Sequence, residues 1–296
     1  MKTIRELKLR IASTTNIQQI TTAMKMVAAA RLKKAQVRLE SARPYARKMA
    51  EVTLDLAALT PWSFNPLLRK HHCCLKDLII VFTGDRGLSG NFHHDIADQA
   101  IEFGKKLSEK NNVSYYLIGL KGYHRFLEKE ISVFERFEGP VAGVSFATAQ
   151  ELGKKIINWY TEEQFDRINL FYAKFYSALS QKSRPFQLLP IDPAQAKAKE
   201  ESGLFIFEPA RKKLLDSILP RYIESEIFRS FLETEAGELG ARMAAMSAAS
   251  DNAAEIIEEY QLEFNRIRQS HITNEIAEIV GGAEVLKREP AKLGDY

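Results

Sequence analysis

The stretch RYIESEIFRSFLETEAGELGARMAAMSAASDNAAEIIEEYQLEFNRIRQSHITNEIAEIVGGAEVL, residues 221–286, decides the fold. It contains no proline, and apolar or small residues recur in it at alternating gaps of four and three. These positions are Leu239, Met243, Met246, Ser250, Ala253, Ile257, Tyr260, Phe264 and Ile267. Such a heptad seam predicts a helix that packs along another helix. With the residues leading into it, the helix extends over roughly 75 residues, on the order of 110 Å.

Residues 1–59 predict the second helix. Its apolar stripe begins at Ile4, Leu7 and Ile11 and ends in a regular four-three alternation that reaches Leu56. Between the two parts, a shift in phase places Ile17, Ile20, Met24 and Val27 on the stripe. A phase shift changes the supercoil locally, so we expect a non-uniform coiled coil. Pro44 lies inside the pattern and is expected to bend the helix or divide it into two pieces.

The two predicted helices carry opposite charge. Residues 1–59 contain twelve Lys and Arg against four Asp and Glu, whereas residues 221–286 contain five against thirteen. Opposite charge and matching apolar seams predict that they pair with each other. Since both are tethered to the chain between them, the pair is antiparallel, and the longer second helix overhangs Met1 by roughly 20–30 Å. Its apolar positions shift there, which predicts docking on another protein; they are Ile272, Ile276, Ile279 and Val280.

The middle of the chain has the pattern of a Rossmann-like α/β domain. Residues 78–82, LIIVF, form a continuous apolar run that is typical of a strand buried on both faces. Further strands are expected at 113–119, 131–137, 167–175 and 184–189, with helices at 91–109, 123–129 and 145–160 between them. Alternating strands and helices predict a mostly parallel sheet. The fold class is therefore α/β plus a long antiparallel coiled coil, with N- and C-terminal helices flanking the inserted domain.

No stretch carries a convincing active site. The loop GDRGLSG, residues 84–90, lies between a predicted strand and helix, but it lacks the Lys-Ser/Thr of a phosphate-binding loop and dinucleotide-loop spacing. A structural turn is the favoured interpretation. His71-His72-Cys73-Cys74 places four metal-binding side chains too close together to surround zinc. The adjacent cysteines are read as free thiols. We expect no catalytic residue, cofactor or metal.

The basic residues of 1–59 permit a nucleic-acid interpretation. Tyr45 is the only aromatic residue in that segment, and base stacking needs more of them. A charge-matched protein partner is therefore favoured over nucleic acid. No apolar run reaches the roughly 20 residues that span a bilayer, and charges from Lys2 onward interrupt any signal-peptide core. We expect a soluble, intracellular, unprocessed protein.

Several stretches, taken in order, resemble the γ subunit of F-type ATP synthases. They are IRELKLRIASTTNI (4–17), TAMKMVAAA (22–30), DRGLSG (85–90), RMAAM (242–246) with Asp251-Asn252-Ala253, NRIRQ (265–269), ITNEI (272–276) and EIVGGA (278–283). The resemblance implies a central rotor shaft inside a hexamer of three α and three β subunits. The α/β domain would bind the ε subunit and the membrane ring of c subunits. Ion flow would turn the shaft, and the β subunits would carry the ATP chemistry.

The resemblance also assigns contact residues. Those that match β-facing positions are Met24, Lys25, Met26, Arg268, Gln269, Thr273 and Glu275, and Phe207 and Glu208 match positions toward the c ring. The chain would then be a non-catalytic subunit, present once per complex, on the cytoplasmic side of a bacterial inner membrane. Gly237-Glu238-Leu239 departs from the family's usual triplet, so only Glu238 is carried over. Residues 287–296 extend past the usual end of the family.

Two other functions fit parts of the pattern. A static coiled-coil scaffold needs only the two helices, and an α/β enzyme with a helical arm needs nucleotide binding at residues 84–90. The expected division of the chain is a helix at 1–60, an α/β domain at 70–208, a second helix at 209–286 and a charged tail at 287–296. Truncation of the last helix and nucleotide titration distinguish the three functions.

Overall fold

The computed structural model describes residues 3–61, 65–69, 76–192 and 211–287. Two long helices, α1 (Ile4–Ala58) and α5 (Arg211–Lys287), flank an α/β domain in the sequence. The domain contains η2 (Pro66–Leu68), β1 (Lys76–Phe82), α2 (Phe92–Ser108), β2 (Asn112–Ile118), α3 (Leu120–Glu128), β3 (Glu135–Arg136), α4 (Phe146–Thr161), β4 (Arg167–Ser177) and β5 (Ser180–Leu189). The predicted fold class is confirmed.

The sheet has five strands in the order β3-β2-β1-β4-β5. The first four strands are parallel, and β5 returns antiparallel to β4. Residues of β1 alternate between two cores, as the two-residue period of a strand requires. Leu78, Ile80 and Phe82 face the core that α4 and α5 cover, whereas Ile79 and Val81 face the core beneath α2 and α3. Both faces are covered, which explains the continuous apolar run.

The chain forms two compact units. One comprises residues 25–245 and the other residues 1–24 and 246–296. In the larger unit the first third of α5 belongs to the domain core, where Leu219, Ile223 and Phe231 are buried. Farther along, Leu232 and Leu239 of α5 pack with Leu39 of α1. Almost every residue from 222 to 242 is therefore buried, because this part of α5 lies between the domain and α1.

In the smaller unit α1 and α5 pair alone. The α5 seam is confirmed: from 251 to 267, the residues that are not exposed are the five predicted seam residues and Glu263. Thr22 and Ser250 share a hydrogen bond of 2.8 Å, and Lys8 lies over the ring of Phe264 at 5.7 Å. From Thr22 to Lys8 the residue number falls along α1, whereas from Ser250 to Phe264 it rises along α5, so the helices are antiparallel.

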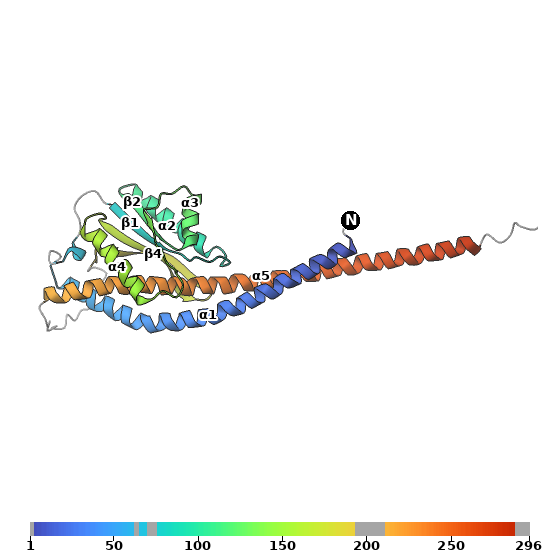
Figure 1. Cartoon of the computed structure of the whole chain (residues 1–296), viewed down its shortest axis with the longest axis horizontal. Coiled ribbons are helices and arrows are strands. Elements are labelled where there is room, and N and C mark those ends of the chain that lie inside the picture. Colours follow the sequence, from blue (N-terminus) through green and yellow to red (C-terminus); the bar gives the residue numbers. More distant parts are fainter. Residues whose placement is uncertain (1–2, 62–64, 70–75, 193–210, 288–296) are drawn as a thin grey trace, which may run out of the picture. The chain divides into compact units, whose positions relative to one another are not determined.

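One expectation for α1 is wrong, and one of the two outcomes expected at Pro44 is excluded. The phase shift does not occur, because Ile17, Ile20 and Val27 are exposed. Instead the four-three alternation continues without interruption through four partly covered polar residues, Thr14, Gln18, Thr21 and Lys25, to Ala28. Of the two outcomes expected at Pro44, division of the helix does not occur, since α1 runs unbroken from Ile4 to Ala58, as does α5 through Pro220. Figure 1 shows α1 as one curved helix. Packing along both helices outweighs the loss of one backbone hydrogen bond at each proline.

Candidate functional site: a fastened shaft and an unpartnered helix end

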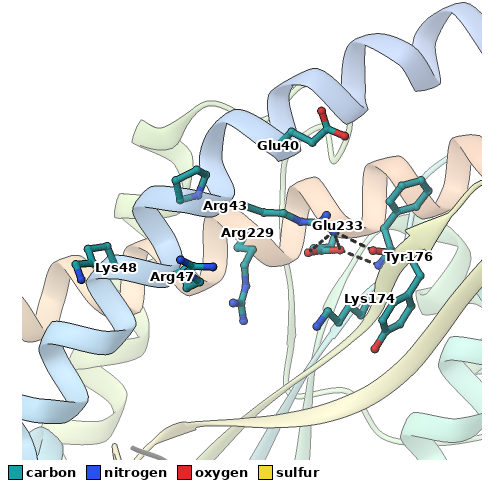
Figure 2. A pocket seen from close by; sticks show the side chains of 10 residues that line it. Glu40, Arg43, Arg47, Lys48, Lys174, Tyr176, Arg229 and Glu233 are labelled. Atoms are coloured by element: carbon teal, nitrogen blue, oxygen red, sulfur yellow. Dashed lines mark hydrogen bonds and ion pairs between the residues drawn. The ribbon is translucent and has the colours of Figure 1, made fainter. Parts of the chain in front are cut away.

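Three carboxylates of α5, within ten residues, fasten it to the domain. The first is Glu233, whose side chain is 3% exposed. Its Oε2 accepts a hydrogen bond of 2.7 Å from the backbone N–H of Phe175 in β4. Arg43 of α1 donates to both oxygens of Glu233 at 3.2 Å and to the carbonyl of Phe175 at 2.9 Å (Figure 2). One buried carboxylate therefore joins α1, α5 and the end of the sheet.

The second carboxylate is Glu235, half a turn farther along α5. Arg38 of α1 donates to its Oε2 at 3.2 Å, and the backbone N–H of Gly143 donates to its Oε1 at 3.2 Å. Arg38 also donates to the carbonyl of Val144 at 2.8 Å. The loop before α4 is thereby held against both long helices. A charge-assisted bond is stronger than a neutral one, so this contact resists sliding along the helix axis.

The third carboxylate is Glu238, which pairs with Arg242 one turn later. Arg242 donates to the carbonyl of Gly87 from Nε at 3.2 Å and from an NH2 group at 3.1 Å. This fixes the loop of residues 84–90 on α5. A side chain at position 84 is excluded, because a Cβ on Gly84 would lie 2.2 Å from Oε2 of Glu238. The loop is a structural turn, as predicted from the sequence, and the carbonyl of Gly87 within it accepts hydrogen bonds from Arg242 of α5.

His93, at the start of α2, completes this contact. Its Nδ1 accepts from the N–H of Gly84 at 3.2 Å, and its Nε2 donates to the carbonyl of Arg86 at 3.0 Å. Burial lowers the pKa of His93 to about 4, so the ring is neutral at neutral pH. The 4.0 Å between its Nε2 and Glu238 is consequently not an ion pair. Burial also raises the pKa of Glu238, against the opposing effect of Arg242.

These contacts were only partly predictable. The opposite charges of the two helices indicated that they would pair, and Arg38–Glu235 and Arg43–Glu233 confirm it. The sequence did not single out Glu233 or Glu235, because their partners lie on the loop before α4 and at the end of β4. His93 stands out in the sequence only within the cluster His93-His94-Asp95, which is explained by a helix start near water, whereas the structure buries its ring against the loop after β1. A useful signal was present in the acidic run at 233, 235 and 238, which falls where α5 is buried all round.

The smaller unit offers a different surface. Every residue of α5 from 268 to 284 is exposed. The apolar side chains Ile272, Ile276, Ile279 and Val280 are between 46% and 71% exposed. On α1, Leu9, Ile17 and Ile20 are likewise exposed. These residues contribute nothing to the cores of the described chain, so burying them requires a partner.

The predicted contact residues fall into two groups that the structure does not bring together. Met24 and Lys25 are partly covered, and Met26 is 67% exposed. The other group, Arg268, Gln269, Thr273 and Glu275, lies on the exposed end of α5. Thr22 pairs with Ser250, so Gln269 lies 19 residues, or about 28 Å, farther along α5.

Contacts within the second group are local. Arg268 stacks over Phe264 at 5.9 Å, Thr273 donates to the carbonyl of Gln269 at 2.9 Å, and His271 lies 3.1 Å from Glu275. Phe207 and Glu208 lie outside the described residues, as do His71-His72-Cys73-Cys74 and the tail at 288–296. Within the described ranges no cluster of His, Cys, Asp and Glu suits a metal ion, and no helix is both long and apolar enough to cross a membrane.

Comparison with known proteins gives full-length matches. The sequence matches the family described as ATP synthase over residues 3–286. The ATP synthase gamma chain of Trichlorobacter lovleyi is 41% identical over 289 residues, which cover 97% of this chain and 100% of the relative. The ATP synthase gamma chain of Halothermothrix orenii is 40% identical over 292 residues, with the same coverage.

Solved structures share the architecture. A chain of the Euglena gracilis mitochondrial ATP synthase, in rotational state 3, aligns with a TM-score of 0.67 at 18% identity, over 99% of this chain and 98% of that one. A chain from the central stalk and c ring of the Tetrahymena thermophila mitochondrial ATP synthase aligns with a TM-score of 0.56 at 24% identity, over 78% and 99%. At these identities the likeness establishes the fold.

Proposed function

Because this chain belongs to the ATP synthase gamma-chain family, the central-stalk rotor subunits of F-type ATP synthases, we propose that its two compact units divide the work of coupling. The unit of residues 1–24 and 246–296 bears on the α and β subunits, together with Lys25 and Met26 at the start of the unit of residues 25–245, and the rest of that second unit receives torque from the membrane side. The observation that carries this proposal is the end of α5, where seventeen consecutive residues from 268 to 284 are all exposed although four of them are large and apolar.

The partner of this helix end is the sleeve formed by three α and three β subunits. Exposed apolar side chains become stabilising only when a second surface covers them. The β-facing residues are Met24, Lys25 and Met26 on α1 and Arg268, Gln269, Thr273 and Glu275 on α5. The two groups of contact residues lie about 28 Å apart along the helix pair, so the same shaft contacts each β subunit at two positions along its axis. The assignment of these residues is supported by the sequence resemblance and by their exposure, apart from the partly covered Met24 and Lys25.

Coupling follows from asymmetry. The helix pair presents different side chains on each side, so its interaction free energy with a surrounding β subunit depends on the angle of the shaft. A rotor changes the state of a site only through such a difference in interaction free energy. The β subunits carry the ATP chemistry, and this chain is non-catalytic, in single copy, and without cofactor or nucleic acid.

The carboxylates of Glu233, Glu235 and Glu238 serve the second part of coupling, which is the transmission of torque from the domain to the long helices. Torque applied to the domain reaches the helices through Glu233, Glu235 and the Glu238–Arg242 pair, and each of these joins α5 to a different segment of the domain, the last through the bonds of Arg242 to Gly87. The domain faces the ε subunit and the c ring, with Phe207 and Glu208 on the c-ring side. We place the complex on the cytoplasmic side of a bacterial inner membrane, with this chain held there through its partners.

Co-assembly with the α and β subunits tests the proposal. The full chain, a chain ending at Ile267 and a chain ending at Lys287 are each expressed with these subunits in inverted membrane vesicles, and ATP hydrolysis and ATP-driven ion uptake are measured together. We expect the chain ending at Lys287 to behave as the full chain and the chain ending at Ile267 to lose ion uptake per ATP. Unchanged uptake without residues 268–296 would show that the helix end does not bear on the sleeve and would favour a static scaffold.

A further inference from the structure

A basic groove lies between α1, α5 and the end of β4, in the larger unit (Figure 2). It has a volume of about 1050 Å³. Five cationic and two acidic side chains line it together with Pro44 and two aromatic residues: Arg43, Arg47, Lys48, Lys174, Arg229, Glu40, Glu233, Phe175 and Tyr176. Pockets for apolar small molecules are lined mainly by hydrophobic side chains, so this groove suits an anion.

Three of the five cations already have carboxylate partners. Arg43 is held by Glu233, and Arg229 is paired with the buried Glu226. Lys48 lies 3.0 Å from Glu51 and points away from the groove in Figure 2. These pairs balance most of the charge of the walls, and the second acidic residue of the lining, Glu40, points away from Arg47 and Lys174 in Figure 2.

Arg47 and Lys174 remain without a carboxylate. No described residue gives Arg47 a hydrogen bond or an ion pair, and the contact of Lys174 is the ring of Tyr176, 5.3 Å from its Nζ. In Figure 2 the two side chains reach toward the same hollow from opposite walls, α1 and β4, with Arg229 between them. The Nε of Arg229 is buried and has no acceptor among the described groups. Like charges held together in this way repel each other unless an anion lies between them.

We propose that this groove binds a small anion that carries two linked phosphate groups. Its two uncompensated cations match two anionic groups, and the planar guanidinium of Arg47 offers paired N–H donors that fit phosphate oxygens. Phosphate is favoured over the carboxylates of an acidic polypeptide because the cations converge on a hollow from a helix, a strand and a second helix. A polypeptide would need them in a row along one face. This ligand site is separate from the contact surfaces of the proposed function.

Calorimetric titration of the full chain with pyrophosphate at low salt tests the proposal. The double variant Arg47→Gln/Lys174→Gln removes the uncompensated cations, and Lys105→Gln/Lys110→Gln, on the exposed surface at the end of α2, is the control with the same change in net charge. We expect pyrophosphate to bind at least about tenfold more tightly than inorganic phosphate, since two charge contacts replace one. The double variant should weaken pyrophosphate binding by a factor of at least about ten, and the control should leave it unchanged.

Three results would overturn the proposal. The first is the absence of pyrophosphate binding to the full chain. The second is an equal loss in both double variants, which would mean that only net charge matters. The third is tighter binding of a polyglutamate peptide or of cardiolipin-containing vesicles than of pyrophosphate, lost in Arg47→Gln/Lys174→Gln, which would identify an acidic polypeptide or a lipid headgroup as the occupant. Because the free chain is used, none of these results depends on rotor function.

Discussion

At the scale of single residues, the neutral His93 makes the stability of the larger unit depend on pH. Its pKa is about 4 in the folded chain, against 6.5 for an unperturbed histidine. Between these values the unfolded chain takes up a proton that the folded chain does not, so the free energy of unfolding falls as pH drops from 6.5 toward 4. A shift of this size corresponds to about 3 kcal/mol.

The variant His93→Gln isolates this contribution. Urea unfolding of the full chain and the variant at pH 7 and pH 4 gives the loss of stability on acidification for each. We expect a smaller loss in the variant, by about 3 kcal/mol, because glutamine does not titrate. Glu238, whose raised pKa acts in the opposite direction, is present in both chains and cancels. Equal losses would mean that the pKa of His93 is not lowered in the folded chain.

Gly84 tests how closely α5 approaches the domain. In Gly84→Ala the new methyl group would meet the Glu238 carboxylate at 2.2 Å, and Arg242 holds that carboxylate in place. We expect a loss of about 1–3 kcal/mol of unfolding free energy, measured by urea titration. The matched control is Gly87→Ala in the same loop, where the added Cβ lies 3.5 Å from the flexible end of Lys121. A similar loss in both variants would refute the close-contact explanation.

At the scale of elements, the α1–α5 pair in the smaller unit depends on a few buried side chains. Leu7 is fully buried and Leu9 is 65% exposed on the same turn of α1. We expect Leu7→Ala to weaken local pairing by about 2–3 kcal/mol and Leu9→Ala to leave it unchanged within about 0.5 kcal/mol. Amide hydrogen exchange of residues 4–11 measures this directly. Protection should fall at least about 30-fold in Leu7→Ala; equal protection in the two variants would contradict the seam.

The helices and the sheet could largely be predicted from sequence, because their signals are local. The four-three repeat of α5 and the apolar run of β1 report burial directly. The central part of α1 could not be predicted, since its seam residues Thr14, Gln18 and Thr21 are polar while Ile17 and Ile20 face outward. An analysis of apolar periodicity therefore selects the exposed Ile17 and Ile20 instead of the polar seam residues, and it predicts a phase shift that α1 does not have.

The contacts that hold α5 to the domain could not be predicted from the sequence, because their partners lie on segments that are far apart in the chain. Arg43 and Glu233 meet only because the register of α1 against α5 coincides with the end of β4. Charge balance predicted that the helices attract each other, but not which side chains meet. β3, predicted at 131–137, is only two residues long, because it pairs with β2 at Tyr116 and Leu117 alone.

At the scale of the whole molecule, the exposed end of α5 should matter for the complex and not for the fold of the chain. Replacing Ile272, Ile276 and Ile279 by serine removes apolar surface that is 46%, 57% and 71% exposed. We expect the thermal unfolding of the free chain to stay unchanged, because exposed substitutions have small effects. Pull-down with the α and β subunits should become weaker.

The matched control changes three exposed apolar residues of the larger unit, Leu120, Leu127 and Leu179, to serine. These lie on the α/β domain, so the α–β pull-down should be unaffected. Weaker assembly in both triple variants would show that total exposed apolar surface, rather than the end of α5, governs association.

The central claim is that this chain turns inside its complex, and ATP-driven rotation of a probe measures that directly. The complex is immobilised through its β subunits, and a bead is attached to an introduced cysteine at Lys110→Cys on the α/β domain, with Cys73 and Cys74 replaced by serine. We predict stepwise rotation in one direction on addition of ATP, stopping when ATP is removed. A bead that only fluctuates about one angle, in a complex that still hydrolyses ATP, would contradict the rotor account.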